Sequence, residues 1–108
     1  MEILTRFWWL LCAHALTDYV LQPEWMGRHK GAFLELPHHS YGPWWWSMAA
    51  HSLVNAAGVL YVTQRLWPSV GEFVVHFLLD TLKQQGKISA TEDQTGHLLS
   101  KLIWSIWV

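Results

Sequence analysis

The chain has a single cysteine, Cys12, among its 108 residues. This scarcity excludes an intrachain disulfide framework and any zinc motif built on paired cysteines. Charged residues are also few, at 14% against about 25% in ordinary soluble domains. The net charge is −1 when the histidines are neutral, so electrostatics give no basis for binding nucleic acid. The length fits a single domain, residues 1–108.

Apolar residues, by contrast, make up 52% of the chain, and nine residues are tryptophan. The longest stretch without Asp, Glu, Lys or Arg is PWWWSMAAHSLVNAAGVLYVTQ, residues 43–64. Such a stretch is long enough for a helix across a bilayer core of about 30 Å. Tryptophans flank it at both ends, as in the aromatic belts of membrane proteins. We therefore expect an integral membrane protein in contact with lipid, with a soluble helical bundle as the alternative.

Helix start and stop signals divide the chain into four helices. Pro23 ends the first, and the patterns Ser69 with Glu72 and Ser89 with Glu92 are capping boxes that start the third and fourth. The expected bounds are about residues 3–22, 44–66, 70–85 and 90–108. The Gly- and Pro-rich connection between the first two helices is expected to lie along the membrane surface. The predicted fold is all-α, a four-helix transmembrane up-down bundle.

Each of the four helices carries one histidine with an acid or amide four residues away. The pairs are His14 with Asp18, His51 with Asn55, His76 with Asp80, and Asp93 with His97. Residues at this spacing share one helix face. Counted from the helix ends in an up-down bundle, the four histidines fall at one depth. The three aspartates fall about one helical turn nearer the end formed by the first and third connections, and the asparagine lies deeper.

Such a convergence of polar groups needs compensation, because one carboxylate at membrane depth costs roughly 2.5–3.5 kcal/mol. A divalent metal supplies it, with zinc favoured first, iron or manganese as alternatives, and one or two ions per chain. The predicted ligands are His14, Asp18, His51, His76, Asp80, Asp93 and His97. An aspartate that is not a ligand, among Asp18, Asp80 and Asp93, would serve as the general base for hydrolysis of an ester, phosphoester or amide. A metal-free polar network or proton relay is the alternative.

The basic residues suggest an orientation in the membrane. Arg28 and Lys30 lie in the first connection, and Lys83 and Lys87 flank the third. The positive-inside rule then places these connections in the cytoplasm and the polar site toward the cytoplasmic leaflet. The apolar end of the chain, WSIWV, also suggests packing against a second copy in a homo-oligomer.

The sequence resembles a group of small bacterial and bacteriophage membrane proteins of unknown function. The matching segments are HALTDYVLQPEWM, HSLVN, EFVVHFLLDTLK and DQTGH. The polar residues that they share with this group include His14, Glu72, Lys83 and Gln94. The resemblance implies a bacterial inner-membrane location and groups these polar residues, but it implies no activity. A looser similarity is to membrane-bound metal-dependent hydrolases. Two functions follow as hypotheses. The first is a metal-dependent hydrolase that acts at the membrane surface. The second is a non-enzymatic protein with a structural polar or metal core that acts in superinfection exclusion, lysis or host-membrane modification.

Overall fold

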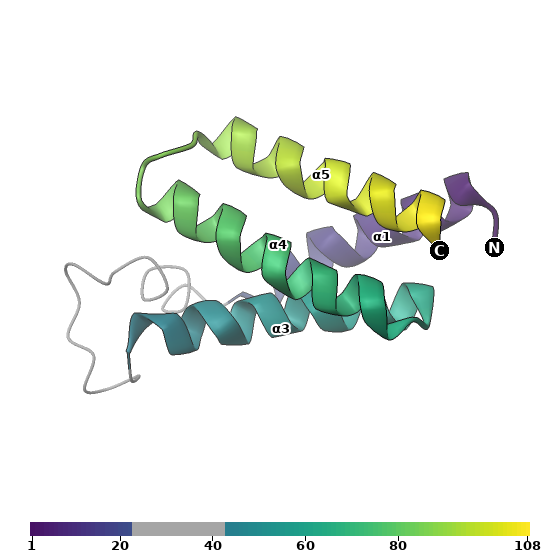
Figure 1. Ribbon diagram of the computed structural model, residues 1–108, viewed down its shortest axis with the longest axis horizontal. Helices are drawn as coiled ribbons and strands as arrows, with labels where there is room; N and C mark the ends of the chain where they lie inside the picture. Colours follow the sequence, from purple (N-terminus) through teal and green to yellow (C-terminus); the bar gives the residue numbers. More distant parts are fainter. Residues whose placement is uncertain (23–42) are drawn as a thin grey trace.

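The computed structural model describes residues 1–22 and 43–108, and all regular structure within them is helical. The elements are α1 Ile3–Ala15, a π-helical turn η1 Leu16–Val20, α3 Trp44–Thr63, α4 Leu66–Gln84 and α5 Ala90–Trp107. Successive α-helices alternate in direction, so both termini lie at one end of the bundle (Figure 1). Both α1 and α4 pack against α3 and α5, which closes the four helices around a common axis. The all-α bundle is therefore confirmed; the predicted surface-lying connection falls outside the described residues.

Local signals account for several helix ends. The Ser89 hydroxyl accepts a hydrogen bond from the Glu92 amide, and the Glu92 carboxylate accepts one from the Ser89 amide, which confirms this capping box. Gly86 follows α4 with a φ of 74°, the left-handed conformation that glycine adopts most easily. At the end of α3, Gln64 takes this conformation with a φ of 57°, so the chain turns there into α4.

The predicted start of the third helix at residue 70 is wrong. Helix α4 begins four residues earlier, with Arg65 as its N-cap, because Pro68 lies in its first turn, where a missing amide hydrogen breaks no helical bond. Ser69 is therefore inside the helix, and its hydroxyl donates to the Ala56 carbonyl of α3 at 2.7 Å. Glu72 is buried and caps nothing. This capping box was a coincidence of spacing.

The described bundle has a polar interior and an apolar exterior. Its buried apolar side chains are few, namely Leu10, Met48, Ala56, Val59 and Trp104. The other buried side chains include all four histidines of the helices, Glu72, Asp80, Asp93 and Lys101. Many large apolar side chains are instead exposed, and they come from all four α-helices. This distribution is the reverse of that in most soluble domains, whose charged residues are almost never fully buried.

Among the described residues, none of the helices has both the length and the apolar character to cross a membrane. The stretch expected to span, residues 43–64, does form one continuous helix. However, its buried face carries Ser47, His51, Ser52 and Asn55, which reduce its apolar character. The transmembrane part of the predicted fold is thus not confirmed.

A close contact between α4 and α5 gives a first prediction, for the substitution Gly71→Ala. A Cβ at Gly71 would lie 2.7 Å from the Trp104 ring, inside any allowed contact distance. That ring cannot easily move, because its Nε1 donates to Glu72 at 3.0 Å and the ring packs against Trp67 in a T-shaped pair with centroids 5.8 Å apart. We expect overpacking to lower the free energy of unfolding by about 1–3 kcal/mol, measured by denaturant titration followed by circular dichroism.

Gly96→Ala is the matched control for this substitution. Its added Cβ would meet Leu79 Cδ1 at 2.8 Å, the end of a half-buried flexible side chain that can rotate away. Alanine also favours a helix over glycine by about 1 kcal/mol, so Gly96→Ala should be neutral or stabilising. Equal losses for the two variants would contradict the assigned rigidity of Trp104.

Candidate metal centre

Four imidazole rings, one from each helix, meet on the axis of the bundle. The ring centroids of His51 and His76 are 4.8 Å apart, those of His76 and His97 4.4 Å, and those of His14 and His97 5.3 Å. The common depth predicted from the helix ends is therefore present in the structure. Because these side chains are almost fully buried, a polar cluster takes the place of an apolar core.

Asp18 is the carboxylate at the centre of this cluster. Its Oδ1 lies 2.9 Å from His51 Nε2 and 3.4 Å from His76 Nε2, and its Oδ2 lies 3.7 Å from His14 Nε2. Asp18 lies in the π-helical turn η1, a distortion that is often found at functional sites. The wider turn changes the register between α1 and the residues after it, so Asp18 reaches histidines from two other helices.

The other two aspartates lie around this centre. Asp80 Oδ2 is 3.8 Å from the Nε2 atoms of both His51 and His76. Asp93 Oδ1 is 3.1 Å from His97 Nε2, in the adjoining part of the cluster. All seven predicted ligands thus lie in one cluster, but at different distances from its centre.

Three of the predicted ligands form a compact donor set. One ligand atom each from Asp18, His51 and His76 lie within 4.8 Å of one another. In a tetrahedral zinc site with bonds of about 2.0–2.2 Å, ligand atoms are separated by roughly 3.3–3.6 Å. Asp18 Oδ1 lies 3.4 Å from His76 Nε2, within this range, and 2.9 Å from His51 Nε2, a hydrogen bond that would lengthen around an ion. Small side-chain shifts would therefore bring the three atoms around one ion.

His76 adds an independent sign of a missing partner. It is fully buried, and neither of its ring nitrogens has a hydrogen-bond partner within the described part of the chain. Buried polar atoms without partners are rare, because each costs about 1–3 kcal/mol of lost hydration. A metal ion bound to Nε2 would remove the cost at that nitrogen, so the residues present fit a divalent cation.

A second donor set lies beside the first and shares His76. It consists of Glu72, His76 and His97, again with ligand atoms within 4.8 Å of one another, and all three are buried. Glu72 differs from the aspartates in its other contacts: its carboxylate contacts the Lys101 ammonium and accepts a hydrogen bond from Trp104 Nε1 at 3.0 Å.

The predicted ligand set leaves out three polar residues of this cluster, although the pattern did lead us to expect Lys101 to pair with a neighbouring helix or to extend toward the membrane surface. Glu72 and His76 have the same four-residue spacing as the predicted pairs, but Glu72 was assigned to a helix cap. Lys101 lies four residues after His97, which is the equivalent signal on α5. Gln94 entered only through the resemblance; its Oε1 lies 3.1 Å from His14 Nε2, and its amide donates to Asp18 Oδ2 at 3.2 Å.

The predicted pair on α3 has two different roles. His51 belongs to the central donor set, whereas Asn55 accepts a hydrogen bond from the Thr17 hydroxyl at 2.8 Å and donates to the His51 carbonyl at 3.0 Å. Asn55 therefore ties α3 to η1 behind the donor set. Such outer contacts fix the orientation of the residues that hold a ligand.

Lys83 lies at a partly exposed edge of the cluster. Its side chain is 32% exposed, and its Nζ is 3.5 Å from Asp80 Oδ1 and 3.8 Å from Asp93 Oδ2. By comparison, Asp80 and Asp93 have 3% and 1% of their side chains exposed. Within the described residues, Lys83 thus borders the buried carboxylates on the side that solvent reaches.

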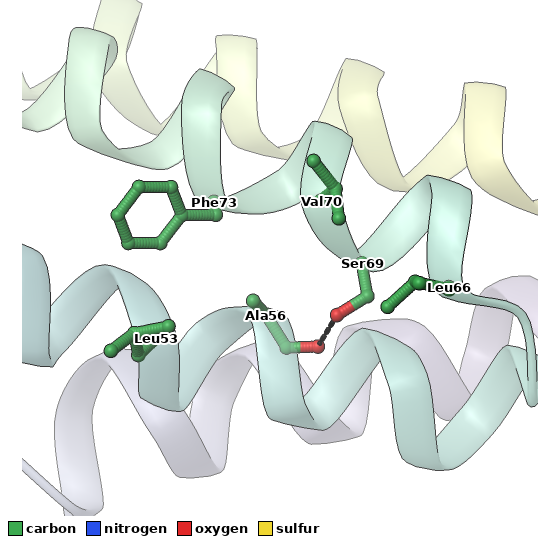
Figure 2. A pocket seen from close by; sticks show the side chains of 6 residues that line it. All are labelled: Leu53, Ala56, Leu66, Ser69, Val70 and Phe73. Carbon is green, nitrogen blue, oxygen red and sulfur yellow. Dashed lines mark hydrogen bonds between the residues drawn. The ribbon is translucent and has the colours of Figure 1, made fainter.

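A groove on the outside of the bundle is chemically different. It lies between α3 and α4, has a volume of about 320 Å³, and is lined by Leu53, Ala56, Leu66, Ser69, Val70 and Phe73 (Figure 2). Its one hydroxyl, on Ser69, is already bonded to the Ala56 carbonyl, as Figure 2 shows. The groove therefore offers no group for acid–base or metal chemistry, and the polar cluster is the candidate site.

Comparisons with protein-family models, with curated proteins and with solved structures found no match to this chain. The resemblance to small bacterial and phage membrane proteins accordingly stays a prediction. The function must be argued from the geometry of the cluster.

Proposed function

We propose that this chain is a membrane protein that binds one divalent metal ion at Asp18, His51 and His76 and uses it as a hydrolase. The observation that carries the proposal is the approach of one carboxylate and two imidazole nitrogens, from three helices, to within 4.8 Å of one another. Imidazole and carboxylate ligands suit zinc first, with iron or manganese as alternatives.

The donor set supports a catalytic role because it has three members. Catalytic zinc sites typically have three protein ligands and one open position, whereas structural sites are closed by four. A bound metal would supply an acidified water or a polarised carbonyl. With a metal bound, Asp80, whose Oδ2 lies 3.8 Å from Nε2 of both His51 and His76, would accept the proton of the attacking water. Lys83 would attract an anionic group of the substrate toward the exposed side of the cluster.

The apolar exterior supports a location in membrane lipid. Large side chains such as Trp8, Leu60, Leu78 and Trp107 are exposed on four different helices. Exposed apolar side chains in this number favour contact with lipid or with another protein. Lys83 and Lys87 lie at the end of the bundle that would face the cytoplasm, with the site toward the cytoplasmic leaflet of a bacterial inner membrane.

Asp80→Asn tests the catalytic part of the proposal. Asparagine keeps the shape of the side chain but cannot serve as a base, so hydrolysis should fall by about 10²–10⁴-fold while the metal content stays at one ion per chain. The measurement pairs elemental analysis of protein purified without added ions with turnover of fluorogenic ester and phosphoester lipids in mixed micelles.

Glu92→Gln is the matched control, because it makes the same chemical change on an exposed capping residue. This variant should keep both its metal and its turnover. Wild-type protein that carries no stoichiometric metal would contradict the proposal. A full turnover rate in the Asp80→Asn variant would remove Asp80 from the mechanism.

Burial of the site favours a second candidate function. The side chains of His76, His97, Asp80 and Asp93 are each at most 3% exposed, as expected for a metal or polar core that only holds helices together. The chain would then be a non-enzymatic bacterial or phage membrane protein, acting in superinfection exclusion, lysis or host-membrane modification. Stoichiometric metal without turnover on any ester, phosphoester or amide tested would favour this candidate.

A further inference from the structure

The second donor set, Glu72 with His76 and His97, has the composition of another metal site. Its three ligand atoms lie within 4.8 Å of one another, and the three residues have no measurable exposure. Taken alone, this geometry would predict a second ion next to the first. The surroundings of Glu72 lead to a different conclusion.

Glu72 already has a cation. The Lys101 side chain is 2% exposed, and its ammonium contacts Glu72 Oε1. The other carboxylate oxygen, Oε2, accepts from Trp104 Nε1 at 3.0 Å and from the Ser100 hydroxyl at 3.5 Å. Both oxygens are therefore bound by donors from α5, and the ammonium is on the oxygen that lies 3.9 Å from His76 Nδ1.

We infer that Lys101 fills the place of a second metal ion, so that the centre holds one ion and not two. A lysine ammonium carries one positive charge and three donors and has no acceptor for a metal. A divalent ion at the Glu72 carboxylate would meet this buried charge at short range, where repulsion is poorly screened. The inference rests on the proposed function, since it concerns how many ions the same cluster takes.

The test is the number of zinc ions bound by Lys101→Leu. Leucine removes the charge and adds no metal ligand, which leaves Glu72 and His97 open to an ion. His76, whose Nδ1 lies 3.9 Å from Glu72 Oε1, would complete the set by releasing its ring proton to solvent and bridging the two ions as an imidazolate. We expect one zinc ion per chain in the wild type and two in Lys101→Leu, after dialysis against zinc chloride and elemental analysis of the full chain. Lys101→Arg keeps the charge and should stay at one ion.

The double variant Glu72→Gln with Lys101→Leu supplies the second control. It also removes the negative charge of Glu72, the carboxylate of the second donor set, so zinc binding should return to one ion per chain. If Lys101→Leu is unfolded without metal, Lys101→Gln preserves a hydrogen-bond donor for Glu72, and zinc should raise its melting temperature more than that of the wild type. This readout does not depend on any enzymatic activity.

The outcomes separate the two proposals. Wild-type protein without zinc overturns the proposed function and the inference with it. One ion in the wild type and one in both Lys101→Leu and Lys101→Gln overturns the inference alone. Two ions in the wild type also overturn it, while leaving the central metal site intact. One ion that becomes two only when the charge at Lys101 is removed supports it.

Discussion

Replacing His76 with alanine is expected to abolish stoichiometric metal binding. His76 belongs to both donor sets, it is fully buried, and its Nε2 lies 3.4 Å from Asp18 Oδ1. Loss of an outer-shell partner alone typically lowers metal affinity by about 10–100-fold. Loss of a direct ligand from a three-ligand site should therefore lower zinc affinity by more than ~100-fold. Competition with a chromogenic zinc chelator measures the change.

His97→Ala is the matched control for this prediction. It removes the same side chain from an equally buried position of the same cluster, but His97 is not in the set formed by Asp18, His51 and His76. We expect this variant to keep one ion with an affinity close to that of the wild type. Far-UV circular dichroism verifies that both variants are helical. Equal losses in the two variants would mean that the ion is held elsewhere in the cluster.

Much of this cluster could be predicted because its signal is local and repeated. A histidine and an acid four residues apart share a helix face in any α-helix. His14, His51, His76 and His97 come together because each lies a similar distance from its helix end. The up-down connection of the helices turns those distances into a common depth (Figure 1).

The parts that could not be predicted depend on contacts between distant residues. Glu72 follows Ser69 at the spacing of a capping box, and nothing local distinguishes a cap from a buried acid. Its partner Lys101 is 29 residues away on another helix. The early start of α4 has a local cause instead, because Pro68 fits its first turn and Gln64 takes the left-handed conformation just before it. The π-helical turn that carries Asp18 has no residue signature in the sequence.

The distribution of polar groups also explains why the uncharged stretch at residues 43–64 forms a helix that is not apolar enough to cross a membrane. That stretch suggested a spanning helix, but the buried face of α3 carries serine, histidine and asparagine side chains. The exposed faces are the apolar ones. The buried stripe therefore had to be identified from its polar residues and not from its hydrophobic ones.

Glu72→Leu is expected to destabilise the metal-free bundle more than most single substitutions. The Lys101 ammonium would stay buried without its carboxylate, and Trp104 Nε1 would lose its acceptor. Removing one partner of a buried ion pair typically costs about 3–5 kcal/mol, because the other charge is left uncompensated. Denaturant titration of chelated protein, followed by circular dichroism, measures the loss.

The double variant Glu72→Leu with Lys101→Met distinguishes charge from packing. Replacing both partners of a buried ion pair by apolar groups is often neutral or stabilising, so the pair of changes should restore most of the stability lost by Glu72→Leu. Recovery would show that the single variant fails because of the unpaired ammonium. A double variant as unstable as Glu72→Leu would instead assign the loss to the shape of the α4–α5 interface, where Trp104 contacts both Glu72 and Trp67. In that case Lys101 would not act as the charge that balances Glu72.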